Sequence, residues 1–193
     1  MKRKSFDKIV TSVGAVLTVF LFVLAGLVQW GASFASDSVA SQLKAQQITL
    51  PAATGNADES ADVTAYFKAH GNKLMSTGKD AQMYADHYIA FHMSHMPTYA
   101  EASTQSRAAA AAAAANPSDK ALAADAATKA ATVETVFKGN MLRGTLLTAY
   151  AFGTLGVLAG YGAIAALVGA LIMLVLTLAG LVHIRRTPDS ATI

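Results

Sequence analysis

The stretch that decides the fold is "IVTSVGAVLTVFLFVLAGLV", residues Ile9–Val28. Its twenty residues include no charged side chain. At a rise of about 1.5 Å per residue, a helix of this length spans about 30 Å, which is the thickness of the hydrocarbon core of a bilayer. Trp30 follows it, where an aromatic ring suits the membrane interface. We therefore assign residues 9–30 to a first transmembrane helix.

The flanks of this helix predict its orientation. Residues 1–8 contain Lys2, Arg3, Lys4 and Lys8, and basic flanks tend to remain in the cytoplasm. A cleaved signal peptide is the alternative, because "SFA" at Ser33–Ala35 resembles a cleavage site. However, the apolar run exceeds the usual signal core of about 7–15 residues. A retained anchor is the favoured interpretation.

A second apolar segment runs from Gly144 to Ile184 without an Asp, Glu, Lys or Arg. It is too long for one upright span, which needs about 20 residues. Two antiparallel spans would leave almost no turn and would place "HIRR" outside, against the positive-inside tendency. We expect one long helix over residues 144–184 whose membrane part is about 161–182, with residues 185–193 in the cytoplasm. Both termini are then cytoplasmic.

Small residues are frequent in this second helix, some of them four residues apart. Helices in lipid associate by close approach over small side chains, so these positions predict a helix-packing face. The alternative is that Gly and Ala are simply common in transmembrane helices. The face would meet either the first helix or another subunit, and the sequence leaves both open. Its candidate residues are Gly156, Gly160, Gly162, Ala166, Gly169 and Ala170.

Residues 31–143 are long enough for one modest extracytoplasmic domain. Their pattern is helical: Ser60 or Asp62 is placed to cap one helix, and Thr98 with Glu101 forms a capping-box pattern for another. A last helix is expected from near Ser118 into the second membrane segment. The predicted fold class is therefore all-α, with two transmembrane helices flanking an extracytoplasmic helical bundle.

Composition excludes several classes of function. Of 193 residues, 53% are hydrophobic and none is cysteine, and the mean hydropathy is +0.39. Disulfides, thiolate metal sites and iron–sulfur clusters are thus ruled out. The net charge is only +3 and the basic residues are scattered along the chain, so nucleic acid is not an expected partner. No HExxH, GxSxG or phosphate-binding loop occurs. We expect neither an enzyme nor a bound cofactor.

The stretch "MYADHYIAFHMSHM", Met83–Met96, raises the question of a metal site. On a helix, His87, His92 and His95 fall on one broad side. Zinc needs about four ligands, and the helix offers two or three imidazoles without a clear carboxylate partner. The favoured interpretation is a polar-aromatic packing surface. A metal-binding or sensor protein using these three histidines is the alternative.

Several stretches together resemble a family of small actinobacterial membrane proteins with two spans. The resemblance covers most of the chain, and its most specific part is "LRGTLLTAYAF", residues 142–152. The other matching stretches are "SQLKAQQITLP", "YADHYIAFHM", "TYAEAS" and the sequence "VFKGNM" that precedes the specific part.

Members of that family are often labelled as ring-opening dioxygenases, a label for which the residues show no iron site. The mass of 20.0 kDa, the two spans and the outer helical domain also resemble an accessory subunit of the corynebacterial respiratory supercomplex. That supercomplex joins the cytochrome bcc complex, a menaquinol–cytochrome c reductase, to an aa-type cytochrome c oxidase. The resemblance implies a stabilising or assembly role at the cell membrane, with subunits of those two enzymes as partners.

Overall fold

The computed structural model describes residues 2–192. It is 81% helical and, over the described residues, contains no strand. Two of its helices, α1 (Arg3–Ala45) and α6 (Lys120–Arg186), are long and apolar enough to cross a membrane. The predictions of an all-α chain and of two such helices are confirmed.

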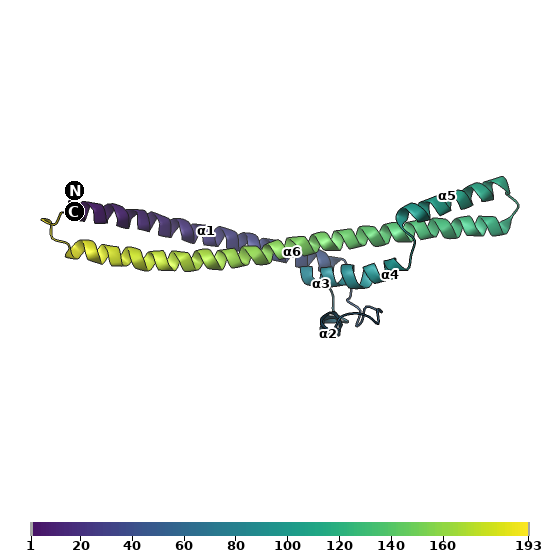
Figure 1. Cartoon of the computed structure of the whole chain (residues 1–193), viewed down its shortest axis with the longest axis horizontal. Helices are drawn as coiled ribbons and strands as arrows, with labels where there is room; N and C mark the ends of the chain where they lie inside the picture. The colour runs from purple at the N-terminus through teal and green to yellow at the C-terminus, as the bar shows by residue number, and fades with distance from the viewer. Residues whose placement is uncertain (1, 193) are drawn as a thin grey trace. The chain divides into compact units, whose positions relative to one another are not determined.

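The described chain contains six α-helices and one π-helix (Figure 1). The helices α3, η1 and α4 follow one another without a break and form a single rod over residues 78–94. The chain divides into two units, Met1–Asp37 with Thr154–Ile193, and Ser38–Gly153. Between the two long helices lie α2 (Ala61–His70), α3 (Gly78–Met83), η1 (Tyr84–Ile89), α4 (Ala90–Ser94) and α5 (Tyr99–Ala115).

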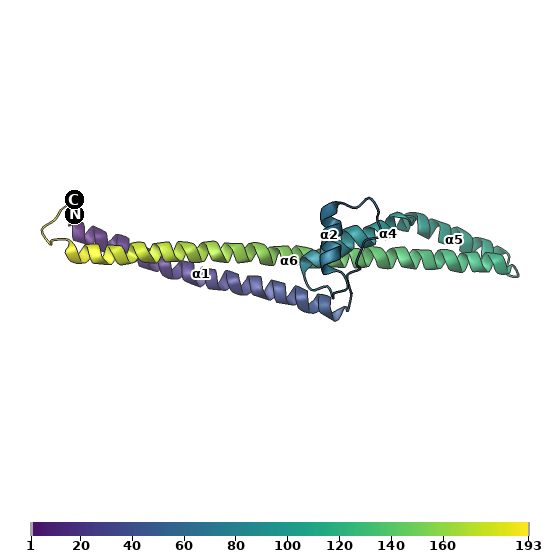
Figure 2. The same cartoon turned by 90° about the horizontal axis from the view of Figure 1, so that it is seen from below.

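In the first unit, α1 and α6 lie side by side and antiparallel, with the first turn of α1 beside the last turn of α6 (Figures 1 and 2). The Arg3 amide donates to the carbonyl of Ala191 at 3.1 Å. Further along the pair, the hydroxyl oxygens of Thr18 and Thr177 are 3.4 Å apart. This unit is therefore a two-helix hairpin closed by its two termini.

The hairpin is held along a seam of small residues that recur every seven positions. A seven-residue repeat keeps one side of a helix facing its partner, and small side chains let the two backbones approach closely in lipid. All of the seam residues are buried: Thr11, Thr18, Ala25 and Ala32 on α1, and Gly156, Ala163, Ala170 and Thr177 on α6.

Glycines beside the seam set how closely the helices approach. A Cβ at Gly14 would lie 2.9 Å from the hydroxyl oxygen of Thr177, and one at Gly180 would lie 2.6 Å from that of Thr11. Both distances are shorter than real Cβ contacts. By contrast, a Cβ at Gly26 would meet nothing within 4 Å. The seam therefore requires glycine at Gly14 and Gly180, whereas Gly26 lies outside it.

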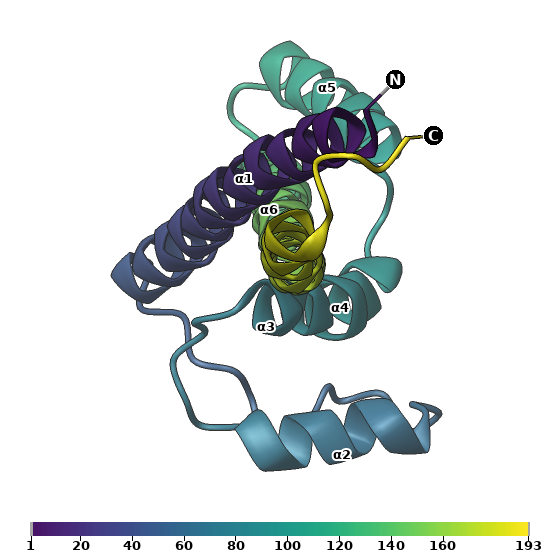
Figure 3. The same cartoon turned by 90° about the vertical axis from the view of Figure 1, so that its left-hand side faces the viewer.

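In the second unit, the rod formed by α3, η1 and α4 lies between α2 on one side and α6 on the other (Figure 3). Its core buries the side chains of Leu50, Phe67 and Met75 almost completely. Ser60 caps α2 by accepting a hydrogen bond from the Val63 amide. Of the two predicted caps, Ser60 and Asp62, the structure therefore uses Ser60. The whole core cluster joins the end of α1, the loop that follows it, α2, the rod and α6.

The helices α5 and α6 form the remaining part of this unit. Thr98 and Glu101 make the predicted capping box at the start of α5. Within the eight-alanine run, residues 108–115, Ala109, Ala112 and Ala113 are half-buried and the others are exposed. The helix α6 continues without a break through Gly139, where a Cβ would collide with the Met93 side chain. The long helix expected over residues 144–184 is thus the end of a helix of 67 residues.

A disulfide across the seam tests the hairpin, because the chain has no native cysteine. We expect the double variant Thr18→Cys/Thr177→Cys to form an intramolecular disulfide on mild oxidation in membranes, measured by gel mobility. Adding Gly14→Leu should lower its yield, because overpacking a close contact costs about 1–3 kcal/mol.

Gly26→Leu is the matched control on the same helix and should leave the yield unchanged. Equal yields for Gly14→Leu and Gly26→Leu would contradict the proposed tight packing at Gly14.

Candidate functional site

The π-helix η1 is the irregular element of the α3–α4 rod and lies inside the Met83–Met96 stretch. It spans Tyr84–Ile89. A π-helical turn inserts an extra residue into a helix, rotates the side chains that follow, and often occurs at functional sites. The first candidate site is therefore centred on η1.

The three histidines of this stretch bind three different partners. The Nδ1 atom of His87 lies 3.0 Å from a carboxylate oxygen of Glu59. The Nδ1 atoms of His92 and His95 lie 2.7 Å and 2.9 Å from backbone carbonyls of their own helix, one turn earlier. Over residues 2–192, no three His, Cys, Asp or Glu side chains are grouped so as to hold a metal ion. The structure does not bring these imidazoles together as a ligand set.

Aromatic rings occupy the same side of the rod as two of the histidines. The rings of Tyr84 and Tyr88 stack with centroids 4.9 Å apart, and Tyr88 lies 4.3 Å from the ring of His92. Phe91 meets the ring of His95 edge-on at 4.8 Å. Such contacts favour a packed polar-aromatic stripe, in which the imidazole rings pack against the aromatic rings.

Two ion pairs attach the π-helix to its surroundings. The first joins His87 to Glu59 in the loop before α2. The second joins Asp86 to Arg143 of α6, with 3.0 Å between a guanidinium nitrogen and a carboxylate oxygen. The Nε atom of Arg143 is buried without a hydrogen-bond partner. These pairs fix the rotation of η1 relative to α2 and α6, which is a positioning role.

Asp80 is the most heavily bonded acid of the unit. Its side chain is 8% exposed and accepts the Tyr66 hydroxyl at 2.7 Å and the amides of Ser76 and Thr77 at 3.0 Å each. The imidazole of His70 lies 3.7 Å away. Burial alone would raise the pKa of Asp80, but these donated hydrogen bonds outweigh it and hold the pKa below its ordinary value.

The hydrogen bond between Tyr66 and Asp80 also affects the phenol of Tyr66. Burial, and then the hydrogen bond and the charge of Asp80, raise the pKa of Tyr66 above its ordinary value. The carboxylate also completes a capping box with Thr77 at the start of α3. Asp80 therefore ties α2, the preceding loop and α3 together, and all of its bonds are to the chain itself.

The structure separates the predicted small-residue face of α6 into seam and non-seam positions. Gly156 and Ala170 are buried in the seam, and a Cβ at Gly156 would lie 3.2 Å from the Ala35 side chain. The other four positions flank the seam. Ala166 and Gly169 are half-buried, Gly162 is exposed, and a Cβ at the half-buried Gly160 would meet nothing within 4 Å. Part of this face thus meets the first helix, and Gly160 does not.

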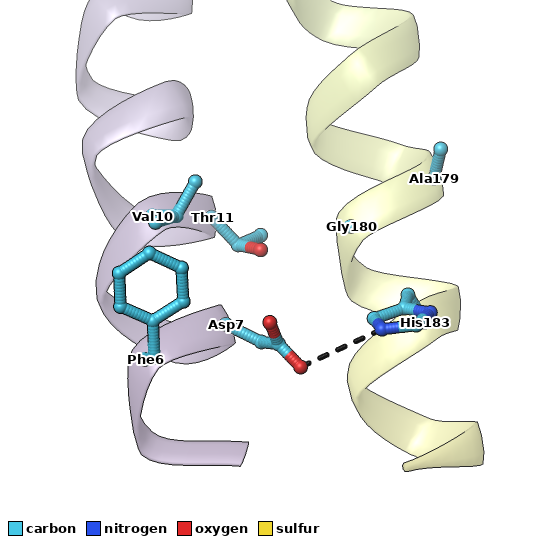
Figure 4. A pocket seen from close by; sticks show the side chains of 7 residues that line it. All are labelled: Phe6, Asp7, Val10, Thr11, Ala179, Gly180 and His183. Carbon is cyan, nitrogen blue, oxygen red and sulfur yellow. Dashed lines mark ion pairs between the residues drawn. The ribbon is translucent and has the colours of Figure 1, made fainter. Parts of the chain in front are cut away.

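A second candidate site is a groove between the two helices where both termini meet (Figure 4). It encloses about 430 Å³. Asp7 of α1 and His183 of α6 point toward each other across it, with 3.5 Å between a carboxylate oxygen and Nε2. Phe6, Val10 and Ala179 provide apolar walls. This groove combines apolar walls with ionisable groups at one end of the hairpin.

Two tertiary features that organise these sites were not predicted from the sequence. Asp80 was not singled out, although "TGKD" carries the spacing of a capping box. The threonines of the seam were also missed, although Thr11 and Thr18 are seven residues apart, as are Ala25 and Ala32. A search for small residues at heptad spacing in both apolar segments would have found the seam.

Comparisons of the chain with protein-family models, with curated proteins and with solved structures found no match to any of them.

Replacing Asp80 with asparagine tests the bonds that join α2 to α3. We expect Asp80→Asn to lower stability by about 1–3 kcal/mol, because the amide cannot accept every donor that faces it. The folded-state pKa of Asp80 is depressed, so its stabilisation is complete above the unfolded-state pKa of about 3.9 and is lost as the pH falls through the lower folded-state value. The variant should therefore lack this acid-dependent loss.

The measurement is thermal unfolding of the full chain in detergent, followed by tyrosine near-ultraviolet circular dichroism between pH 7 and pH 2. Asp125→Asn, at an exposed position of α6, is the matched control and should unfold like the parent. An Asp80→Asn curve that matches the parent at every pH would contradict the central role of this carboxylate.

Proposed function

We propose that this chain is a non-catalytic accessory subunit that stabilises or helps to assemble a membrane protein complex. In this proposal, α1 and α6 span the cell membrane, both termini are cytoplasmic, and residues 31–143 form an extracytoplasmic helical domain. The resemblance to the respiratory accessory subunit favours a complex of cytochrome bcc and an aa-type oxidase.

The observation that carries the proposal is the difference between the inner and outer faces of the hairpin. Inside, the chain uses small residues to pack α1 against α6. Outside, it presents large apolar side chains: Phe20 is 58% exposed, Leu176 is 59% exposed and Val175 is 65% exposed. Apolar surface on this scale is stable only when lipid or another protein covers it.

The polar groups of the second unit support a structural role. Glu59 and Asp86 each pair with a basic side chain of the unit, and Asp80 is occupied by donors from α2 and the α3 cap. Groups engaged in this way stabilise a domain and are not free to hold a substrate. The exposed faces of the unit are then its means of contact with neighbouring subunits.

Gly160 separates docking from hairpin stability. It belongs to the predicted small-residue face, yet a Cβ there would meet nothing within 4 Å. A partner helix can therefore approach α6 at Gly160 without competing with the seam. Gly156 serves the seam, so its replacement would report on the hairpin and not on docking alone.

Affinity purification of the tagged full chain from native membranes tests the proposal. We expect subunits of a larger membrane complex to co-purify in fixed proportion with the parent chain. Gly160→Leu should reduce their recovery several-fold, whereas Gly26→Leu, at another open position, should not. Recovery of the parent chain alone would refute the accessory role, and undiminished recovery with Gly160→Leu would refute docking at Gly160.

Metal analysis of the same purified chain addresses the alternative function. The separate bonds of the three histidines lead us to expect less than one-tenth equivalent of copper or zinc, unchanged by His92→Ala. Stoichiometric metal that is lost in His92→Ala would favour a metal-binding or sensor protein.

A further inference from the structure

We propose that the groove at the closed end of the hairpin, defined by Phe6, Asp7, Val10, Thr11, Ala179, Gly180 and His183, binds the headgroup region of an anionic phospholipid. This inference rests on the membrane placement of the hairpin in the proposed function. It adds a ligand class and a site to that placement.

Basic side chains are concentrated at the end of the hairpin that contains the groove. Six Lys and Arg side chains lie within the first eight residues of the chain or at the last turn of α6, against two acids, Asp7 and Asp189. The ends of the two helices are held together, so these charges act at one place. The six are Lys2, Arg3, Lys4, Lys8, Arg185 and Arg186.

The two acids do not cancel this excess. Lys4 lies 2.6 Å from a carboxylate oxygen of Asp189. The hydrogen bond and charge of Lys4, with smaller contributions from Lys2 and Lys8, lower the pKa of Asp189. Asp7 is turned into the groove toward His183 (Figure 4). The remaining cations, among the described residues, form no ion pair. The helix ends next to the groove, which we call the rim, therefore carry a net positive charge.

The shape of the groove also suits a lipid. Gly180 has no side chain, and a Cβ there would collide with Thr11, so the floor of the groove lies directly on the seam. Phe6 and Val10 are 46% and 54% exposed and form one apolar wall. An apolar wall below a cationic rim matches a molecule that has acyl chains below a phosphate.

Asp7 and His183 line the groove next to the rim. One carboxylate oxygen of Asp7 is buried without a hydrogen bond, and the Nε2 atom of His183 lies 3.5 Å from it. This arrangement turns the Asp7 charge inward and away from the rim. A phosphate at the rim therefore meets Lys and Arg side chains, which bind phosphate by charge and by hydrogen bonds.

A cluster of four to eight Lys and Arg beside a transmembrane helix is the pattern that attracts anionic lipid, and each such charge strengthens binding by about fivefold. A zwitterionic lipid offers the same acyl chains without the net charge. The inference therefore predicts selectivity for phosphatidylglycerol over phosphatidylcholine by the same chain in the same detergent.

Native mass spectrometry of the detergent-purified full chain, mixed with either lipid at equal concentration, tests this selectivity. We expect the triple variant Lys8→Gln/Arg185→Gln/Arg186→Gln to bind phosphatidylglycerol about 100-fold more weakly than the parent. The variant Lys44→Gln/Lys68→Gln/Lys120→Gln removes equal charge from exposed positions elsewhere in the chain and should bind like the parent.

Besides equal binding of the two lipids, three results from the charge variants and free phosphate would overturn the lipid site. These are undiminished phosphatidylglycerol binding by the first triple variant, equal losses in both triple variants, and displacement of the lipid by millimolar inorganic phosphate, which would identify a free-phosphate site. Ala179→Phe narrows the groove without changing charge and should also weaken binding; unchanged binding would move the lipid out of the groove.

Extraction of cell membranes with alkaline carbonate separates this inference from the proposed function. A chain that stays in the membrane pellet but shows no lipid selectivity overturns only the lipid site. A chain released into the supernatant overturns the membrane placement and the lipid site together.

Discussion

The close approach of α1 and α6 along small side chains is the contact on which the hairpin depends. Little hydrophobic drive exists between helices in lipid, so under the proposed membrane placement the association of α1 and α6 relies on van der Waals contact over short distances. Thr18 and Thr177 bring their hydroxyls within 3.4 Å of each other, and Gly14 and Gly180 leave no room for a Cβ. Larger side chains here would separate the helices, and with them the two ends of the chain.

The second unit depends on a different kind of contact. Its rod of α3, η1 and α4 is fixed by polar bonds to four surrounding segments. Asp80 bonds to α2 and to the loop before α3, Asp86 bonds to α6, and His87 bonds to Glu59 in the loop before α2. Removal of one partner destabilises the unit most at Asp80, whose side chain is 8% exposed, because its donors would be left without an acceptor. The π-helix is therefore held in one rotation, and its aromatic stripe has one orientation.

Sequence patterns predicted the elements better than their contacts. The apolar run from Ile9 and the capping residues Ser60 and Thr98 depend on local chemistry, which a sequence displays directly. The Asp80–Tyr66 bond joins residues on two helices, and no local pattern specifies it. The seam was displayed in the sequence as a seven-residue repeat, but a search at four-residue spacing selected Gly160 and Gly162 beside it. The π-turn of Tyr84–Ile89 is bonded to Glu59 and Arg143, which are distant in the sequence, and no local pattern indicated it.

The basic residues at the chain ends illustrate how one feature serves two purposes. As a sequence pattern, Lys2 to Lys8 and Arg185 with Arg186 predict which side of the membrane the termini occupy. As a structure, the hairpin seam brings those same residues to one end, where Arg3 bonds to the carbonyl of Ala191. Charge that is dispersed over the two ends of the sequence becomes concentrated because α1 and α6 pack tightly. A loosened seam would therefore spread these basic residues apart and lower the local positive charge without removing any of them. The glycines of the hairpin thus determine its surface electrostatics as well as its packing.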